Sequence, residues 1–175
     1  IADKDKLIDN QQMYFNQSGI KSFLADEEHN IIWISTLSGL IAYHVPSKNY
    51  KIFSEADGLG NSHVYGALKN NNDLWLSTNR GLSNVILTWD RKEIFPSARF
   101  INYSSKDGLP DDEFNTGAFH KGRSGDFYFG TVRGLVWFKP ENINPNPNPP
   151  AIRLLELKVN EVNIDSIAAE YISSL

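Results

Sequence analysis

The sequence predicts an all-β fold built from small repeated sheets, and three observations favour this prediction. Short apolar segments alternate with turns rich in Gly and Asn. One such segment occurs three times, and the central part of the chain lacks the 3.6-residue apolar period of an amphipathic helix. The 175 residues are 41% apolar and 12% aromatic, which is enough for a packed core and excludes a disordered chain.

The repeated segment is a pair of strands around a Gly turn. Its copies span 31–40, 74–82 and 127–135, and each ends in Gly-Leu. A large aromatic residue marks one position in every copy, namely Trp33, Trp75 and Tyr128. We expect these residues to fill the space between neighbouring sheets, because a residue needed identically in every unit serves packing. An Asp-Gly-Leu element also occurs twice, at 57–59 and 107–109.

A repeat of roughly 40 to 50 residues with short strands, aromatic anchors and Gly turns is typical of four-stranded β-propeller blades. The middle unit gives the clearest elements, and we expect strands over 64–69, 74–78, 82–87 and 100–103. Asn and Asp residues at 70–73 form the first turn, and Gly81 forms the second. The stretch 87–99 is expected to be a long loop. Its unrepeated Trp89 and Phe95 are candidate stacking or contact surfaces.

Three strand units are visible, over 20–53, 62–103 and 114–139, and a strand-like segment at 13–16 closes the blade before them. We therefore expect a partial propeller of about three four-stranded blades. A ring needs four to eight blades, so three cannot close one. Because three blades leave the ring open, we expect either further blades upstream or coverage of the open edges by a second copy. The start at Ile1 and not at Met leads us to expect a piece of a longer protein.

The composition changes after residue 139, and we divide the chain there. Residues 1–139 form the propeller blades. Residues 140–150 form a Pro- and Asn-rich linker, which Pro makes stiff and extended. Residues 151–175 form the start of an Ig-like β-sandwich, with a first strand over 152–159; about 25 residues are too few for a core of their own.

Charge and residue counts exclude several classes of function. The net charge of −4 disfavours nucleic acid as a partner, and the absence of Cys excludes disulfides and thiolate metal sites. The chain has no apolar run of about 18 residues that could cross a membrane. Its four His residues occur in different predicted strands and turns, so we expect no metal, and the sequence has no phosphate-loop or dinucleotide-cofactor motif.

The segments 57–59 and 74–82, with Val64 between them, resemble the two-component regulator propeller repeat of bacterial periplasmic sensors. The resemblance covers residues 14–164, including the passage from a last blade into a small β-sandwich before the membrane. It implies a non-enzymatic, periplasmic sensing region of an inner-membrane receptor. The parent would be a sensor histidine kinase that binds an oligosaccharide or another small ligand, signals as a homodimer and reaches the membrane through a segment further downstream.

Strand direction places candidate ligand residues at one end of the blades. If the first strand of each unit descends, the connections into it and the turns between its second and third strands emerge together. Arg, Asn and carboxylate groups suit sugar hydroxyls, and Arg also binds sulfate or carboxylate through two hydrogen bonds. The alternative for the Arg residues is an ion pair with a nearby Asp. The candidates are Arg80, Arg133, Asn79, His63, Asn61, Glu113 and Asn115.

Two other functions remain open. A propeller-fold polysaccharide lyase or hydrolase would use His63, Arg80 and Glu113 on this face, and would require them to converge on one cleft. A non-catalytic scaffold would instead bind other proteins through its blade edges. Asp111 and Asp112 are adjacent on an extended chain and point in different directions, so they do not form an acid-base pair.

Overall fold

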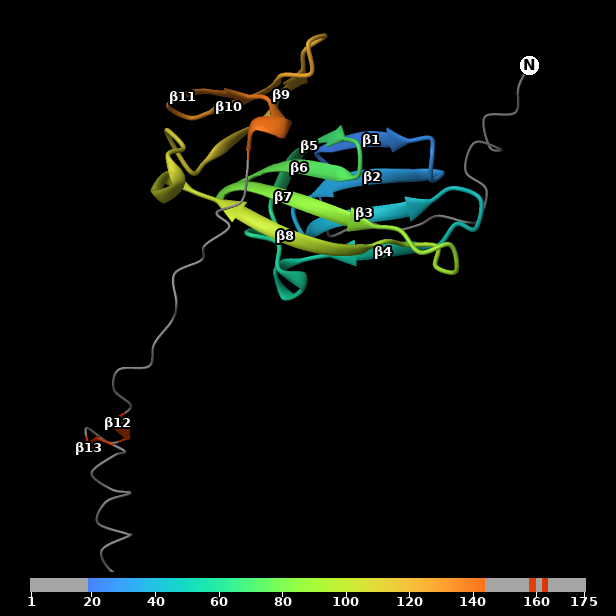
Figure 1. The fold of residues 1–175 in the computed structure, drawn as a ribbon, viewed down its shortest axis with the longest axis horizontal. Coiled ribbons are helices and arrows are strands. Elements are labelled where there is room, and N and C mark those ends of the chain that lie inside the picture. Colours follow the sequence, from blue (N-terminus) through green and yellow to red (C-terminus); the bar gives the residue numbers. More distant parts are fainter. Residues whose placement is uncertain (1–18, 144–157, 160–161, 164–175) are drawn as a thin grey trace, which may run out of the picture. The chain divides into compact units, whose positions relative to one another are not determined.

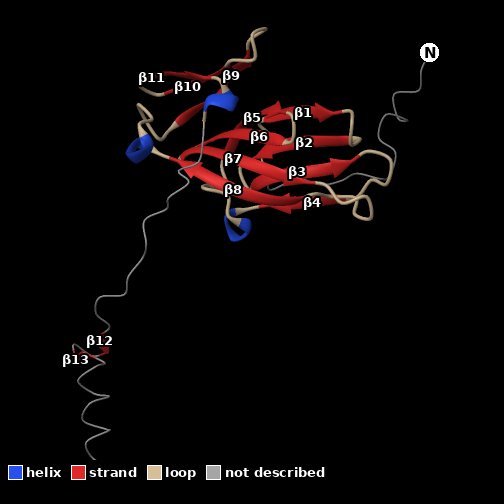
Figure 2. Cartoon of the chain, in the orientation of Figure 1, coloured by secondary structure: helices blue, strands red, loops and turns tan. Residues whose placement is uncertain are grey.

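The computed structural model describes residues 19–143, 158–159 and 162–163, and it confirms the all-β prediction (Figure 1). The chain divides into two units, Ile1–Ile143 and Asn144–Leu175. In the first unit, three antiparallel sheets follow one another along the chain, and the described helices are single 3-10 turns (Figure 2). Within the described residues, no helix is long and apolar enough to span a membrane.

The first two sheets each contain four strands in chain order. Sheet 1 consists of β1 (Ser22–Asp26), β2 (Ile31–Thr36), β3 (Gly39–His44) and β4 (Tyr50–Phe53). Sheet 2 consists of β5 (Val64–Asn70), β6 (Asp73–Thr78), β7 (Gly81–Thr88) and β8 (Ser97–Tyr103). The four strands expected in the middle unit are therefore present, and each is slightly longer than predicted.

The loop predicted over 87–99 is shorter than expected. Leu87 pairs with Ala98 and Thr88 with Ser97, so the loop is confined to 89–96. Ala98 and Phe100 lie on one side of β8 and pack against the core of the unit. With this two-residue alternation, β8 begins at Ser97, before the predicted start at residue 100.

Within the described residues, sheet 3 has three strands, one fewer than sheets 1 and 2. It consists of β9 (Phe114–Lys121), β10 (Phe127–Thr131) and β11 (Gly134–Phe138), in the order β11-β10-β9. After β11 the chain enters the 3-10 turn η4 (Pro140–Asn142). Pro140 at the first position fixes φ for this turn, which follows β11 directly.

Two apolar cores hold the three sheets together. The first joins sheets 1 and 2 through Trp33, Leu40 and Leu76, and the second joins sheets 2 and 3 through Trp75 and Phe129. Trp33 and Trp75 are 0% and 2% exposed, which confirms their predicted role between sheets. The third aromatic of the repeat, Tyr128, is only half-buried because it points to the other side of sheet 3 from its core neighbours Phe127 and Phe129.

The Asp-Gly-Leu elements form the exits from two short helical turns, η2 (Glu55–Asp57) and η3 (Ser105–Asp107). Each turn has a complete capping box, in which the Asp carboxylate accepts a 2.8 Å hydrogen bond from the backbone N–H of the capping Ser. Gly58 and Gly108 follow with φ of 110° and 96°, in the left-handed region that Gly adopts readily. The repeated element therefore caps and ends each 3-10 turn and changes the direction of the chain.

The second unit contains the two-residue strands β12 (Lys158–Val159) and β13 (Val162–Asn163), which pair antiparallel. The strand-like segment at 13–16 and most of the predicted linker and sandwich lie outside the described residues. The predicted linker began at residue 140, but η4 belongs to the first unit. Its Pro140 is buried, and Ile143 packs against the core between sheets 2 and 3.

Candidate functional site

A Thr and a Gly three residues apart shape the turns at one end of the sheets, between β2 and β3, β6 and β7, and β10 and β11. The Thr hydroxyl donates to the Gly carbonyl three residues later, from Thr36 to Gly39 (2.8 Å) and from Thr78 to Gly81 (2.7 Å). The same Thr78 oxygen accepts the backbone N–H of Arg80 (3.0 Å). A Cβ on Gly81 would lie 2.0 Å from the carbonyl oxygen of Tyr103, so only Gly fits there. We call this end of the three sheets the Thr-turn end.

The segments leading into β5 and β9 meet these turns, as the strand directions predict. The backbone N–H of Asn79 donates to the carbonyl of His63 (3.1 Å), and that of Val132 donates to the carbonyl of Glu113 (3.0 Å). The Thr-turn ends of sheets 2 and 3 are also linked, because the Gly81 N–H donates to the Asp112 carbonyl (2.6 Å). Six of the seven predicted residues therefore lie in or beside these turns and entry segments, and Asn115 lies at the start of β9.

Tyr65, a residue that the sequence analysis missed, interacts with both Asn79 and Glu113. The Tyr65 hydroxyl donates to Asn79 Oδ1 (3.0 Å). Burial raises the pKa of Tyr65, and the nearby negative charge of Glu113 raises it further. The phenol therefore stays protonated and serves as a hydrogen-bond donor over a wide pH range. Its place as the second residue of the strand predicted over 64–69 was the signal that could have put Tyr65 at this end, although the register shifts between Val64 and Gly66.

Among the other predicted residues, some side chains form hydrogen bonds or ion pairs and others do not. Arg133 Nε lies 3.3 Å from Asp111 Oδ2, while the Arg133 side chain remains 80% exposed, so the ion-pair alternative describes its geometry. Asn115 Nδ2 donates to the Thr131 carbonyl (2.9 Å). Asn61 bonds within its own loop, because its Oδ1 accepts the His63 N–H (3.0 Å). Within the described residues, the exposed Arg80 guanidinium forms no hydrogen bond or ion pair.

This arrangement suits recognition of hydroxyl or anionic groups. The phenol of Tyr65 and the carboxylate of Glu113 lie near each other, and the exposed Arg80 belongs to the turn whose next residue, Gly81, donates its N–H to the Asp112 carbonyl. Charge-assisted hydrogen bonds from a guanidinium are stronger than neutral ones and match carboxylate or sulfate geometry. Within residues 19–143, no hydrogen bond or ion pair joins the side chains of His63, Arg80 and Glu113, which an acid-base mechanism would require to converge.

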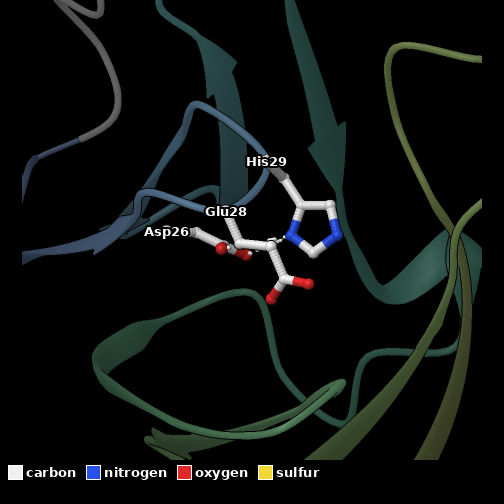
Figure 3. A group of neighbouring side chains, drawn as sticks. All are labelled: Asp26, Glu28 and His29. Carbon is white, nitrogen blue, oxygen red and sulfur yellow. Dashed lines mark hydrogen bonds and ion pairs between the residues drawn. The ribbon is translucent and has the colours of Figure 1, made fainter.

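A second polar cluster lies at the opposite end of the sheets, in the turn between β1 and β2 (Figure 3). Its ligand atoms from Asp26, Glu28 and His29 lie within 4.8 Å of one another, close enough to hold a metal ion. However, Lys69 Nζ of sheet 2 already lies 2.5 Å from Asp26 Oδ1 and 3.9 Å from Glu28 Oε2. The Lys69 ammonium therefore supplies the positive charge that a metal ion would bring. The short spacing of these three residues was the sequence signal for this cluster, whereas their contact with Lys69 is not visible in the sequence.

The Asp26 carboxylate is held ionised inside this cluster. Its side chain is 1% exposed, and His29 Nδ1 lies 3.1 Å from Oδ1. Burial by itself would raise the pKa of Asp26, but the hydrogen bonds and charges of Lys69 and His29 outweigh it and lower the pKa below its usual value. The cluster is thus an ion pair between sheets 1 and 2.

Trp89, a candidate stacking surface from the sequence, lies beside this cluster. Its ring stacks on the imidazole of His29 with a centroid distance of 3.6 Å and an angle of 5° between the planes. Trp89 and Phe95 also pack against the core between sheets 1 and 2. The loop 89–96 therefore contacts the neighbouring sheet of its own chain.

Comparison with known proteins shows that the chain is similar to a histidine kinase. No family model matches the chain. It is 28% identical over 115 residues to histidine kinase P4 of Formosa agariphila, a match that covers 65% of this chain and 8% of the kinase. The chain thus spans less than a tenth of the length of this relative.

The chain also resembles the solved structure of an extracellular domain. The extracellular domain of a B. thetaiotaomicron protein described as a hybrid two-component system is 25% identical, with a TM-score of 0.62 over 82% of this chain and 20% of that chain. The extracellular domain of a second B. thetaiotaomicron protein, described as a one-component system, is 17% identical with a TM-score of 0.36 over 81% of this chain and 24% of that chain. The chain is thus similar to part of a histidine kinase and to the extracellular domain of a hybrid two-component system, as its repeats led us to expect.

Proposed function

We propose that this chain is part of a periplasmic, ligand-sensing region that binds an oligosaccharide and passes a conformational signal to a downstream histidine kinase. The observation that carries the proposal is the structural likeness to an extracellular sensor domain at 25% identity over 82% of the chain. We place the ligand at the Thr-turn end, because the exposed Arg80 follows Asn79 in the turn, Asn79 accepts the Tyr65 hydroxyl, and the charge of Glu113 lies near Tyr65.

The three sheets fit this role as part of a larger ring. Leu135 and Trp137 are 58% and 65% exposed on sheet 3, although the matching Leu40 and Leu82 of sheets 1 and 2 are buried against a neighbouring sheet. Such an uncovered apolar face favours further sheets in a longer, propeller-like receptor. A ligand in that receptor signals only if it binds two placements of the region with different affinity, and we expect the receptor to act as a homodimer.

A thermal-shift screen of this chain against neutral, uronic-acid-containing and sulfated oligosaccharides tests the proposal. We expect one class to raise the melting temperature by mass action. The Arg80→Ala variant should reduce affinity about tenfold or more, because a charged hydrogen bond contributes about 1.5–3 kcal/mol. Lys92→Ala is the matched control, since Lys92 is an exposed cation in the loop 89–96, away from the Thr-turn end.

The same experiment separates the other functions. The oligosaccharide should be recovered intact after incubation, whereas shortened products would support a lyase or hydrolase. The sensing proposal also fails if no class shifts the melting temperature, or if Arg80→Ala and Lys92→Ala weaken binding equally.

A further inference from the structure

Sheet 3 has an open edge at the place where sheets 1 and 2 have a fourth strand. In sheet 1, β3 pairs with β4 and Leu40 faces Phe53; in sheet 2, β7 pairs with β8 and Leu82 faces Tyr103. Their counterpart in sheet 3 is β11, and within the described residues its outer edge pairs with no strand. An unpaired edge presents backbone N–H and C=O groups that can bind another strand.

An apolar hollow of about 220 Å³ lies beside this edge. The residues that line the hollow include Tyr103, Gly108, Leu109, Val136 and Phe138. They come from the end of sheet 2, from the connection after it and from β11 itself. The hollow is therefore next to the path that a fourth strand would take.

The matching place in sheet 2 is occupied by the ring of Phe100, a residue of β8. Phe100 lies with its ring centroid 6.2 Å from that of Phe53, and 3.3 Å from the point where a Cβ of Gly58 would lie. In the repeat, Tyr103 corresponds to Phe53 and Gly108 to Gly58. The Cβ point of Gly108 has no atom within 4 Å. The hollow is thus the space that a Phe100-like side chain would fill in sheet 3.

The two existing fourth strands show what such a partner looks like. β4 carries Tyr50 and Phe53, and β8 carries Phe100 and Tyr103, so each has aromatic residues three positions apart. The second aromatic of each pair faces the Leu that follows the Thr-turn Gly. The hydroxyl of Tyr103 is also buried with no hydrogen-bond partner within the described residues, and an incoming strand brings carbonyl acceptors.

We propose that β11 and this hollow form a strand-binding site for an extended segment with the pattern aromatic-x-x-aromatic. The segment pairs with the free edge of β11 through backbone hydrogen bonds and places its first aromatic ring in the hollow. This is β-strand addition, in which the backbone gives affinity and a side-chain pocket gives specificity. The inference concerns an interaction surface and does not depend on the sugar ligand of the proposed function.

A peptide with the sequence of residues 96–104 tests the site, because it contains the fourth strand of sheet 2. The peptide is titrated into the 175-residue chain, and amide hydrogen exchange locates the contact. We expect saturable binding and slower exchange in Gly134–Phe138, with no change in β4, which already completes its own sheet.

The matched control is the same peptide with Phe100→Ala. Because a buried Phe side chain contributes most of the apolar area, we expect this peptide to bind about tenfold or more weakly. Unaltered exchange in β11, protection of β4 instead, or equal binding of the two peptides would each overturn the proposal. All changes are in the peptide, so the folding of the chain is not affected.

Discussion

Asp26 shows how a single residue connects two sheets. The carboxylate is almost fully buried, and its partner Lys69 lies 43 positions later in the chain, at the end of β5. A buried charge costs several kcal/mol of free energy unless it is paired and hydrogen-bonded. Lys69, His29 and the indole of Trp33 surround the two carboxylate oxygens and meet this requirement.

The lowered pKa of Asp26 predicts acid sensitivity. The folded pKa lies below the unfolded value of about 3.9, so the stability that the ion pair provides is present above that value and is lost as pH falls through the folded pKa. Melting temperature measured from pH 6 to pH 2 should show this loss. In Asp26→Asn the loss should be smaller, and an identical pH profile for both proteins would contradict the assignment.

Gly66 allows β5 to pack closely against Phe119 of sheet 3. A Cβ at this position would lie 2.2 Å from the ring of Phe119 on sheet 3. We expect Gly66→Ala to lower the free energy of unfolding by about 1–3 kcal/mol, as overpacking does in other cores. Gly134→Ala is the control, since its Cβ would meet open space. Urea denaturation measures both, and equal losses would show that the contact between Gly66 and Phe119 is unimportant.

At the scale of elements, the turns before β5 and β9 are set by local sequence. Ser54 and Ser104 cap the η2 and η3 turns through the same pair of reciprocal hydrogen bonds. Both caps are followed by a left-handed Gly, which sends the chain into the next sheet. Short-range chemistry therefore determines where each sheet ends and the next begins.

This regularity predicts similar costs for removing either cap. Ser54→Ala and Ser104→Ala should each destabilise the chain by about 1 kcal/mol, the usual value for a lost Ser cap. Thermal denaturation of the two variants checks the value. Ser105→Ala gives a comparison within the same turn, because its hydroxyl bonds to Asp112 outside the capping box. A cap variant that is as stable as the parent would contradict the role of the box.

The elements also show what sequence patterns can predict. Alternating residues and Asn or Gly turns predicted all four strands of sheet 2, because strand pairing within one sheet depends on neighbouring residues. The repeat could not predict that sheet 3 has three strands within the described residues, because a repeat pattern implies equal units. At the site, the turns were predictable from strand direction, but the contacts of Tyr65 with Asn79 and of Asp26 with Lys69 join parts of the chain that no local pattern relates.

At the scale of the whole molecule, equivalent repeat positions differ in burial. Leu40 and Leu82 are 0% and 2% exposed, but Leu135 at the same position of sheet 3 is 58% exposed. Each sheet covers the preceding one, and sheet 3 has no following sheet within the described residues. The stability of this chain is therefore carried by its two internal cores.

Matched Ala substitutions at two of these positions test this asymmetry. Leu82→Ala should cost about 2–5 kcal/mol because it opens a cavity in the core between sheets 2 and 3. Leu135→Ala should change the free energy of unfolding by about 0.5 kcal/mol or less, as exposed positions do. Urea denaturation compares the two. A large loss for Leu135→Ala would show that this face is covered in solution.

The proposed sensing function requires a ligand to bind at the Thr-turn end. The most direct measurement is a titration of the isotope-labelled chain with neutral, uronic-acid-containing and sulfated disaccharides, one at a time, followed by NMR chemical shifts. We predict that one class perturbs His63, Asn79, Arg80 and Glu113 at the Thr-turn end and leaves the loop 89–96 unchanged. Shifts confined to that loop and the Asp26 cluster, or no shifts with any class, would contradict the proposed sensing site.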